Sequence, residues 1–565
     1  MGKKRRQLKD KPAAVQTPSA AHPEFLSFIE KRASLIAIAA VILASARIIA
    51  TYTVFNHTFD EPVHIACGME WLDKGVYTWE AQHPPLSRVA GAIGPYLLGV
   101  RYQNQDRKVE NPKLQEGLKI LYAGHHYDLT LAMARLGILP FFWIACLVVY
   151  EWGRRYFNRT VAVLAVCSFS FLPPVLAHAG LATTDMALTA FLGAAFLTLM
   201  MWVERPTPAR AAWFGLCGGL AILSKFSCLV FFPAAAGAAF LWYAATERPP
   251  VGHLFQQFRR RLTTLPLAAL VGCLVIWGGY RFSVGKVPPT NLVLPAPELY
   301  AGIREVQIHN RGGHYSYLLG ERGTQGWWYF FPVVLAVKTP LAFSILVGVW
   351  VFLAVKRRLG FQLNWVPAAF AASIMAVGMT SHINIGLRHI LPIYIGLSLL
   401  AAMAAYWMLQ QVGERRWRVV AVALLAAWFA ASSLLSHPDY LPYFNELAGD
   451  HPENIVADSD LDWGQDIKRL AKRLKEVGAQ EVTLSTALVA DFETEHGIPH
   501  RIDKMDVIHP PSGWVAIGIS WWKEYRLGLF DRFPQYVLWP DRFPPAEKVG
   551  KSILLWYFPP GSPDR

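Results

Sequence analysis

Long apolar blocks recur along this chain and constrain its fold more than any other feature. Residues 34–54, and residues 341–355 with the upstream run FFPVVLAV, approach or reach the ~20 residues that a helix needs to cross a bilayer. Hydrophobic residues make up 53% of the chain and charged residues only 17%. These blocks predict an all-α polytopic membrane protein, because a helix satisfies its own backbone hydrogen bonds inside lipid.

Hydropathy and its interruptions together predict about eleven transmembrane helices. They lie at 34–54, 128–150, 160–177, 186–203, 211–226, 227–244, 262–281, 328–354, 363–380, 387–411 and 417–435. With a cytoplasmic N-terminus, every basic connector falls on the cytoplasmic side: 154–159, 205–210, 248–261, 356–358 and 414–418. Residues 55–127, 282–327 and 436–565 then lie on the outer face, where we expect the function.

The chain divides into three parts on this interpretation. Residues 1–33 are basic, then rich in Pro, Ala and Ser, and we expect a disordered cytoplasmic tail; a cleaved signal peptide is the rival interpretation. Residues 34–435 form the transmembrane domain. Residues 436–565 are expected to form a small extracytoplasmic α/β domain, in which NIVADSD, EVTLSTAL, GWVAIGIS and KSILLWYF are candidate strands and DWGQDIKRLAKRLKEVG is a helix.

The net charge of +14 does not indicate nucleic acid, because Lys and Arg cluster in short runs between spans. Membrane lipids are the expected surroundings. The six cysteines lie mostly inside apolar blocks without a C-x-x-C pair, so no disulfide framework is expected.

The first outer segment contains two expected amphipathic helices at the membrane surface. Glu61 and Pro62 resemble a helix start, and apolar residues follow at helical spacing until Gly75. A second apolar stripe runs from Leu86 to Leu97 after the HPP motif.

Asp60 and Glu61, together with Arg88 in HPPLSR (83–88), are the strongest candidates for catalytic residues in the sequence. A carboxylate at the mouth of a bundle can accept a proton from an acceptor hydroxyl, and a guanidinium can neutralise a departing phosphate. The alternative is that the acidic pair only caps a helix while Arg88 reaches lipid headgroups.

Four cations fall inside or beside predicted spans: Arg135, Lys225, Lys338 and Arg388. A charge within a membrane is a candidate functional residue, since an unpaired one costs at least ~2.5 kcal/mol. The predicted topology places the last three toward the outer side. We expect some of them to bind a lipid phosphate together with Arg88, although pairing with structural carboxylates would also explain them.

No metal site is expected. The histidines of the outer segments have no pair at ligand spacing, although a divalent metal stays open as an alternative. Asp458, Asp460 and Asp462 imitate the start of a calcium loop, but Gly464 falls one residue late and Arg469 stands where glutamate is needed. Helix capping explains these aspartates better.

Several motifs carry a family resemblance. FDEPVHIACGMEWLDKG followed by HPPLSR resembles the first external loop of the GT-C glycosyltransferases, in particular the protein O-mannosyltransferases and the aminoarabinose transferase. The mannosyltransferases end this stretch in HPPLGK, so Ser87 and Arg88 depart from the pattern. LAHAGLATTDMAL (176–188), FPVVLAVKTPLA (331–342), GLRHILPIY (386–394) and the segment 443–466 resemble the bacterial branch of the family.

The resemblance implies a GT-C fold and a polyprenyl-phosphate-linked sugar as donor. It implies Asp60 as the catalytic base of an inverting displacement, Glu61 as a neighbour that shapes the site, and Asp185 as a second acidic residue. His83 and His389 lie in the same motifs and are expected to contact substrate. For a bacterial member it implies the cytoplasmic (inner) membrane, with the active site and the C-terminal domain facing the periplasm.

The acceptor stays open between a Ser/Thr hydroxyl of a secreted protein, lipid A, another glycolipid and a cell-wall glycan. A transporter or flippase for a lipid-linked sugar is the rival from another class. It would keep polar residues near the bilayer midplane and show two related halves, and the sequence shows no internal repeat. An inactive scaffold whose tail binds partners is the third possibility.

Overall fold

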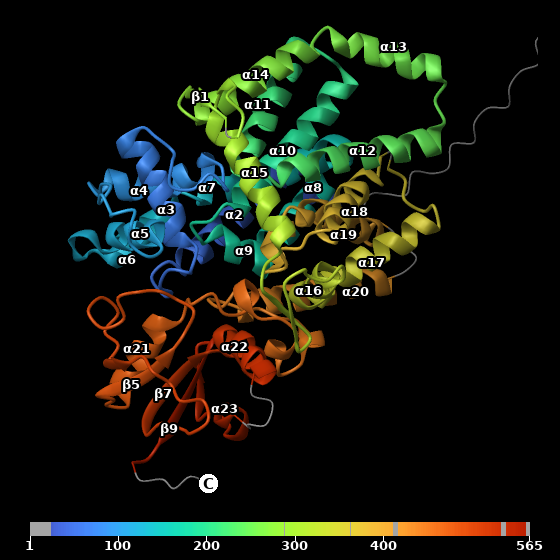
Figure 1. Cartoon of the computed structure of the whole chain (residues 1–565). Helices are drawn as coiled ribbons and strands as arrows, with labels where there is room; N and C mark the ends of the chain where they lie inside the picture. The colour runs from blue at the N-terminus through green and yellow to red at the C-terminus, as the bar shows by residue number, and fades with distance from the viewer. Residues whose placement is uncertain (1–23, 288, 362, 411–415, 533–537, 561–565) are drawn as a thin grey trace, which may run out of the picture.

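The computed structural model describes residues 24–560, apart from 288, 362, 411–415 and 533–537. A large bundle of helices lies above a smaller C-terminal region that contains a β-sheet (Figure 1). The predicted disordered tail extends to residue 33, but Glu24–Lys31 forms helix α1, which packs against α8. Residues 1–23 lie outside the described part of the chain.

The bundle is built from helices throughout its length. The first half contains α2 (Ala33–Ile49), α3 (Glu61–Met69), η1 (Glu70–Lys74), α4 (Pro85–Leu97), α5 (Pro112–Tyr122), η2 (Ala123–His125), α6 (Tyr127–Leu136), α7 (Leu139–Tyr156), α8 (Arg159–Ser170), α9 (Pro173–Ala179), α10 (Asp185–Glu204), α11 (Pro208–Ser224) and α12 (Cys228–Glu247). The second half contains α13 (Val251–Leu262), α14 (Leu265–Gly279), α15 (Pro297–Gly312), α16 (Phe330–Lys338), α17 (Leu341–Val355), α18 (Val366–Gly378), η3 (Leu387–Ile390), α19 (Ile393–Leu409) and α20 (Arg416–Leu435). Two small hairpins accompany them, β1 (Val284–Lys286) with β2 (Val293–Pro295), and β3 (Ser316–Leu318) with β4 (Glu321–Gly323).

Each of the eleven predicted spans contains at least one helix. Within the described residues, four helices are long and apolar enough to cross a membrane, and counting each of four bent pairs as one span gives up to eight. The pairs α8–α9 and α16–α17 bend by 67° and 116°. Pro173 and Pro340 stand at these bends, because proline cannot continue the hydrogen-bond ladder of the preceding helix. The number eleven itself stays a prediction.

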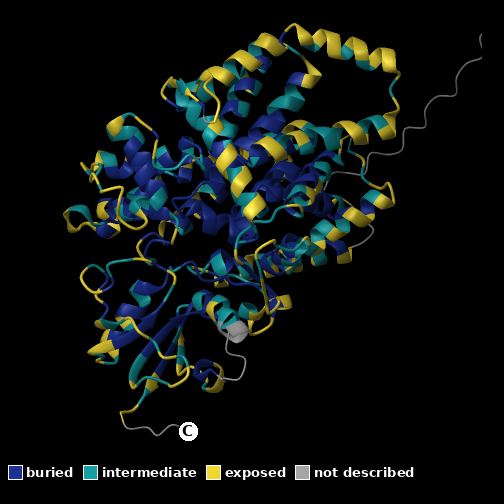
Figure 2. Ribbon diagram, in the orientation of Figure 1, coloured by how far each residue is buried: buried dark blue, intermediate teal, exposed yellow. Residues whose placement is uncertain are grey.

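Two helices form the centre of the bundle. Nearly every residue of α19 is buried, as is most of α10, consistent with helices that are apolar on all sides (Figure 2). Gly193 and Gly396 permit close packing there: a Cβ atom at Gly193 would lie 2.4 Å from the Ile395 Cδ1 atom, and one at Gly396 would lie 2.5 Å from the Pro367 carbonyl oxygen.

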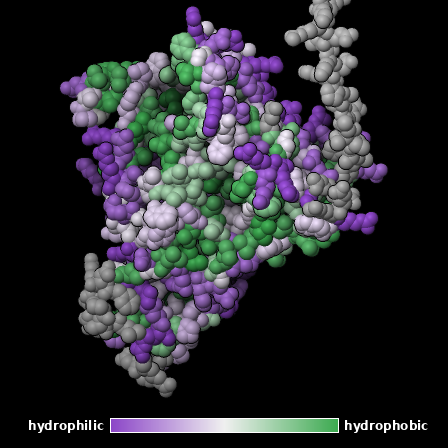
Figure 3. All heavy atoms as spheres, turned by 90° about the vertical axis from the view of Figure 1, so that its right-hand side faces the viewer, coloured by the Kyte–Doolittle hydropathy of each residue, from purple (hydrophilic) through white to green (hydrophobic). Residues whose placement is uncertain are grey.

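The outside of the bundle is apolar as well. On α20 the exposed side chains include Val420, Leu424, Trp428 and Leu435, which a soluble protein would bury. Figure 3 shows hydrophobic residues gathered over the bundle and hydrophilic ones predominating in the C-terminal region below it. Together with the spanning helices, this surface identifies an integral membrane protein.

Residues 55–127, predicted as the first external segment, contain the two expected helices, but α3 is buried along nearly its whole length and is not an amphipathic surface helix. Asp60 precedes α3, Pro62 lies in its first turn, and the helix continues as the π-helix η1 until Gly75, whose φ of 72° ends it. The second expected helix is α4. A third helix in this segment, α5, packs against α3 and was not predicted from the sequence.

The C-terminal region is built on a five-stranded mixed sheet of order β6-β5-β7-β9-β8. Its strands are β5 (Glu481–Ser485), β6 (His500–Ile502), β7 (Gly513–Gly518), β8 (Glu547–Val549) and β9 (Ile553–Phe558). Helix α21 (Ile467–Glu476) packs on one face, while α22 (Ile519–Arg532) and α23 (Trp539–Arg542) lie toward the other. The expected strand NIVADSD is wrong: this segment forms η5 (Pro452–Asn454) and η6 (Asp458–Asp460), with only an isolated bridge at Val456. The short helix η4 (Glu446–Ala448) precedes them.

Buried polar contacts fasten the C-terminal region to the bundle. The Asn56 amide donates to the Gly464 carbonyl at 2.7 Å, and its oxygen accepts from the Ile467 amide at 2.8 Å. The Phe59 amide donates to the Trp463 carbonyl at 3.1 Å. The end of the first span is thereby joined to the start of α21.

Candidate active site

A cavity of about 1070 Å³ lies between the bundle and the C-terminal region. Its apolar wall comes from α12, α15, α16 and α18, with Phe231, Val306, Phe331 and Val377 among the lining residues. Its charged residues come from the first external segment, the α11–α12 and α15 regions, η3 and the C-terminal region: Asp60, Glu80, Arg88, Lys113, Lys225, Arg311, Arg322, Arg388, Asp458, Asp462 and Glu524. The cavity thus joins an apolar surface to a set of mixed charges.

Asp60 and Arg388 meet at this cavity. The Arg388 Nη1 atom donates to the Asp60 Oδ2 atom at 2.9 Å across 328 residues of sequence. Arg388 also donates through Nε to the Ser459 hydroxyl, and its guanidinium lies 4.0 Å from the centre of the Trp463 ring. The Asp60 side chain stays 31% exposed, so it remains accessible from the cavity.

Asp185 lies directly behind the cavity wall. It begins α10, is 1% exposed, and its Oδ1 atom accepts from the Lys225 ammonium at 2.6 Å. Its Oδ2 atom is buried without a hydrogen-bond partner among the described residues, as is the Nδ1 atom of His178. Lys225 itself lines the cavity and has no other acceptor in the described part of the chain. Asp185 therefore acts on the cavity through Lys225.

Arg88 lines the cavity but most of its donors are already engaged. Nε donates to His64, Nη1 to the Tyr77 hydroxyl and the Glu80 carbonyl, and Nη2 to the Glu80 carboxylate at 2.7 Å. A guanidinium has five N–H groups, so four of them have protein acceptors, and the His83 Nδ1 atom near the fifth is itself bonded to the Glu80 carboxylate at 2.7 Å. Arg88 contributes positive charge to the cavity, but most of its donors are already held by the protein.

Glu61 follows Asp60 directly but does not line the cavity. It is fully buried and forms a two-bond ion pair with Arg135, at 2.9 and 2.8 Å. It also accepts from the backbone amides of Thr58 and Ala182. Arg135 donates in addition to three carbonyls of residues 52–56. This pair holds the first external segment to the bundle.

Lys338 likewise points away from the cavity. Its ammonium donates to the Leu441 carbonyl at 2.6 Å and to the Asp460 carbonyl at 2.5 Å, and it lies 4.3 Å from the centre of the Phe444 ring. It fastens the segment after α20 to the end of α16 and does not line the cavity. The two predicted substrate histidines, His83 and His389, do line it.

Sequence reasoning missed several lining residues. Glu80 links Arg88, His83 and Lys113, and those partners lower the pKa of its carboxyl against the effect of burial. Its position three residues before the HPP motif was the available signal. Asp458, Asp462 and Glu524 come from the C-terminal region and form part of the opposite wall. The first two lie in the family-like segment 443–466 but were interpreted as helix caps, and no sequence pattern indicated Glu524.

Burial raises the pKa values of these three carboxyls. The pKa of Asp458 rises to about 6, although Arg388 opposes the shift, and that of Asp462 rises to about 7. The pKa of Glu524 also rises to about 7. Asp462 accepts from the Ser520 amide at 3.0 Å, in the first turn of α22. The helix that follows these aspartates, α21, has Asp466 at its N-cap without a side-chain cap bond.

The described residues contain no group of three or more His, Cys, Asp or Glu side chains arranged to hold a metal ion. The functional groups of the cavity are therefore carboxylates, imidazoles and cations. They are suited to proton transfer and to binding an anionic leaving group.

Part of the chain matches a known protein family. Residues 131–278 match the model of the family described as dolichyl-phosphate-mannose-protein mannosyltransferase. No curated protein sequence matches the chain significantly.

Two solved structures resemble this chain at low sequence identity, and the one with a TM-score of 0.50 shares its fold. ArnT from Cupriavidus metallidurans bound to undecaprenyl phosphate has 14% identity and a TM-score of 0.50, over 92% of this chain and 97% of that chain. AglB from Archaeoglobus fulgidus, in complex with an inhibitory peptide and a dolichol-phosphate, has 11% identity and a TM-score of 0.44, over 85% of this chain and 69% of that chain. The resemblance that the loop motifs carry is thereby confirmed: the chain has the fold of the GT-C superfamily of glycosyltransferases, and its residues 131–278 match a mannosyltransferase family within it.

Proposed function

We propose that the protein transfers a sugar from a polyprenyl-phosphate carrier to an acceptor hydroxyl in this cavity. The observation that carries the proposal is the meeting of Asp60 and Arg388 where the apolar wall borders the charged residues. A lipid-linked sugar needs such a boundary, because its tail is apolar while its phosphate and sugar are polar. The undecaprenyl phosphate bound to ArnT supports this choice of carrier.

Lys225 and Arg388 bind the phosphate of the donor. Both line the cavity and both keep N–H groups without an acceptor in the described part of the chain. Arg88 strengthens the positive potential from the wall, since most of its own donors are taken up by His64, Tyr77 and Glu80. The polyprenyl chain lies along the apolar wall that α12, α15 and α18 provide.

Asp60 acts as the general base of a single inverting displacement. It accepts the proton of the acceptor hydroxyl while the oxygen of that hydroxyl forms a bond to the anomeric carbon. The bond between that carbon and the phosphate oxygen breaks, and the phosphate leaves with the electron pair. Lys225 and Arg388 stabilise its negative charge. Glu61 and Asp185 are positioning residues, because each acts through a cation.

The acceptor we favour is a Ser or Thr hydroxyl of a protein, in line with the family that residues 131–278 match. Lipid A, another glycolipid and a glycan are the alternatives. The C-terminal region, proposed as residues 436–565, contributes Asp458, Trp463 and Glu524 to the cavity and can therefore contact the acceptor. We place the protein in a bacterial inner membrane with this region in the periplasm, since the arginine-rich helix α13 lies at the opposite end of the bundle (Figure 1).

Purified protein supplied with a panel of polyprenyl-phosphate sugars, a Ser/Thr peptide and alternative acceptors tests the proposal through release of the free lipid phosphate. Asp60→Asn should lower the rate by about 10²–10⁴-fold, the usual contribution of a general base. Asp73→Asn is the matched control, because Asp73 follows in the same helical segment but does not line the cavity.

Two results would refute the assignment. Lipid-phosphate release that is equal in Asp60→Asn and the native chain removes Asp60 as the base. Movement of the intact lipid-linked sugar across vesicles, without any release, identifies a flippase.

A further inference from the structure

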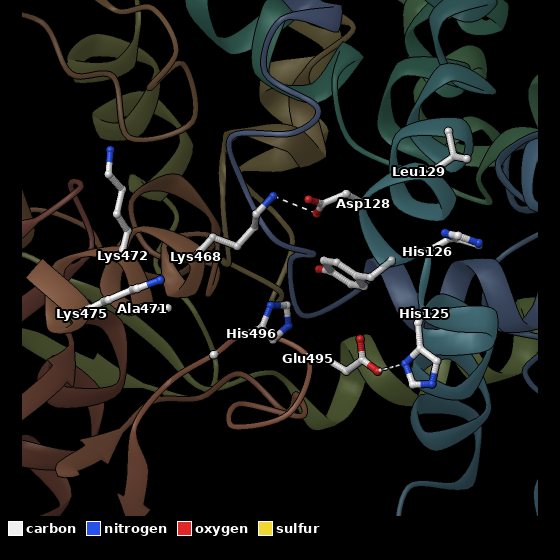
Figure 4. Close-up of a pocket in the computed structure, with 12 residues that line it drawn as sticks. His125, His126, Asp128, Leu129, Lys468, Ala471, Lys472, Lys475, Glu495 and His496 are labelled. Atoms are coloured by element: carbon white, nitrogen blue, oxygen red, sulfur yellow. Dashed lines mark hydrogen bonds and ion pairs between the residues drawn. The ribbon is translucent and has the colours of Figure 1, made fainter. Parts of the chain in front are cut away.

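A second pocket, of about 670 Å³, lies outside the candidate active site. One side is formed by the start of α6 and the residues before it, including His125, His126 and Asp128, and the other by α21 and the segment around His496. Figure 4 shows Lys468, Lys472 and Lys475 on the α21 side, opposite these residues. The pocket shares no lining residue with the active-site cavity.

The two pockets are nevertheless neighbours. Trp463 and Gly464 line the cavity, and Lys468, four residues further along, lines the second pocket. Asn56 holds this short connection in place through its bonds to Gly464 and Ile467. The backbones of Gly464 and Lys468 are therefore at most roughly 14 Å apart, the length that four extended residues can span, and the two pockets are neighbours.

The basic side chains of α21 differ in whether they form ion pairs. Arg469 and Arg473 are neutralised, since Arg469 pairs with Asp439 and Asp466 while Arg473 pairs with Glu476 and Glu547. The lysines at 468, 472 and 475 follow one another at helical spacing and line the pocket. Lys468 pairs with Asp128 at 2.8 Å, whereas Lys472 and Lys475 have no ion pair in the described part of the chain.

The other titratable groups of the pocket do not cancel this charge. Asp128 and Glu495, which lies 3.3 Å from His125, are the two carboxylates that line the pocket, and the three lysines outnumber them. Burial and the neighbouring His57 and Lys468 lower the pKa of His496 to about 4, so this imidazole is neutral at pH 7. The positive charge at neutral pH therefore comes from the exposed lysines.

The pocket lies at the end of a membrane span. Helices α6 and α7 together form a continuous apolar segment, Tyr127–Tyr156, that is long enough to cross a bilayer. Tyr127, Asp128 and Leu129 in its first turn line the pocket, and Leu129 is half exposed. The lysines consequently face the level at which lipid headgroups lie.

We propose that this pocket binds the phosphate of an anionic membrane lipid through Lys472 and Lys475, with Lys468 beside them. The bound lipid stands next to the active-site cavity and holds the C-terminal region against the membrane surface. The proposal does not rest on the transferase reaction, because it concerns binding alone.

Native mass spectrometry of the full chain tests it, in detergent micelles that contain equal amounts of phosphatidylglycerol and phosphatidylcholine. The native chain should retain phosphatidylglycerol preferentially. Each lysine near a membrane surface strengthens the binding of an anionic lipid by about fivefold, so Lys472→Gln/Lys475→Gln should lower retention about 25-fold. Lys504→Gln/Lys551→Gln removes two exposed lysines of the same region outside the pocket and should retain the lipid as the native chain does.

Equal retention by the two double variants would overturn the proposal. Inorganic phosphate provides the second arm, because it carries the same chemical group without an acyl chain. If millimolar inorganic phosphate displaces the phosphatidylglycerol, the site is one for free phosphate and the lipid assignment is wrong. Continued retention under that condition supports the lipid.

Discussion

Asp60 and Glu61 are neighbours in the chain, but their side chains have opposite surroundings. Asp60 faces the cavity and meets Arg388, whereas Glu61 is buried against Arg135. Successive side chains in a helical turn point about 100° apart. Two adjacent acidic side chains at a helix start therefore face different surroundings. Of the two, only Asp60 can accept a proton from a molecule in the cavity.

Replacing Glu61 with glutamine should destabilise the fold. The change leaves the Arg135 charge buried without its partner, and the expected loss is about 3–5 kcal/mol. The apparent melting temperature in detergent at a fixed scan rate measures it. Glu151→Gln, which breaks the more exposed pair with Arg154, is the control and should change little. Equal effects of both substitutions would contradict the structural role of Glu61.

Asp185 and Lys225 should behave as one unit in kinetics. Asp185→Asn and Lys225→Gln each remove the same charge-assisted hydrogen bond, so each should raise the KM for the donor by about tenfold or more. The double variant should be no worse than the more severe single one, because the coupling is direct. Losses that multiply would show that the two residues act separately.

At the scale of elements, α22 and the segment before α21 form the wall of the cavity opposite the bundle. Asp458, Asp462 and Glu524 lie in this wall with raised pKa values. Their ionisation is unfavourable in the folded protein because burial removes water from the carboxylates. The wall therefore makes the stability of the protein depend on pH.

Stability should fall as the pH rises through 7. The folded pKa of Glu524 is about 7, against an ordinary value of 4.5, so between these values the folded chain binds a proton that the unfolded chain has released. Low pH therefore favours the folded state, and the contribution of Glu524 to the free energy of unfolding is lost above pH 7. Apparent melting temperatures at pH 5.5 and pH 8 should differ less in Glu524→Gln than in the native chain. An unchanged difference would show that Glu524 does not contribute to it.

At the scale of the whole molecule, the cavity exists only because the C-terminal region is held against the bundle. Asn56 and Lys338 make this connection through backbone groups of residues 441–467. Each contact joins segments that are more than 100 residues apart. Arg388, which donates to Ser459, and Lys468, which donates to Asp128, add further contacts between the two parts.

Asn56→Ala should loosen the C-terminal region. It leaves the buried Gly464 carbonyl and Ile467 amide without partners, at a cost of about 1–3 kcal/mol for each. Limited proteolysis within residues 436–466 should become about tenfold faster or more, because cleavage follows the population of the opened state. Gln480→Ala is the control and should leave the rate unchanged. In the described part of the chain, the side-chain amide of Gln480 donates only to the nearby Gly478 carbonyl. Equal rates in both variants would place the connection elsewhere.

The sequence alone determined the elements and their membrane character. Apolar blocks and their periodicity predicted a helix in every expected span, and Gly75 ended the first external helix as expected. The apolar run GWVAIGIS predicted β7, while the strand prediction for NIVADSD was wrong because bends near Asp458 override its strand propensity. These features depend on neighbours in the chain, and a sequence contains that information directly.

Only the tertiary structure decided which charges share the cavity. Arg88, Lys225, Lys338 and Arg388 are all candidates in the sequence, but packing engages most donors of Arg88 and turns Lys338 toward backbone carbonyls. Asp60 reaches Arg388 across 328 residues. The physical reason is that a charge takes the partner that packing brings within about 3 Å, and hydropathy and periodicity do not specify long-range distances of that kind.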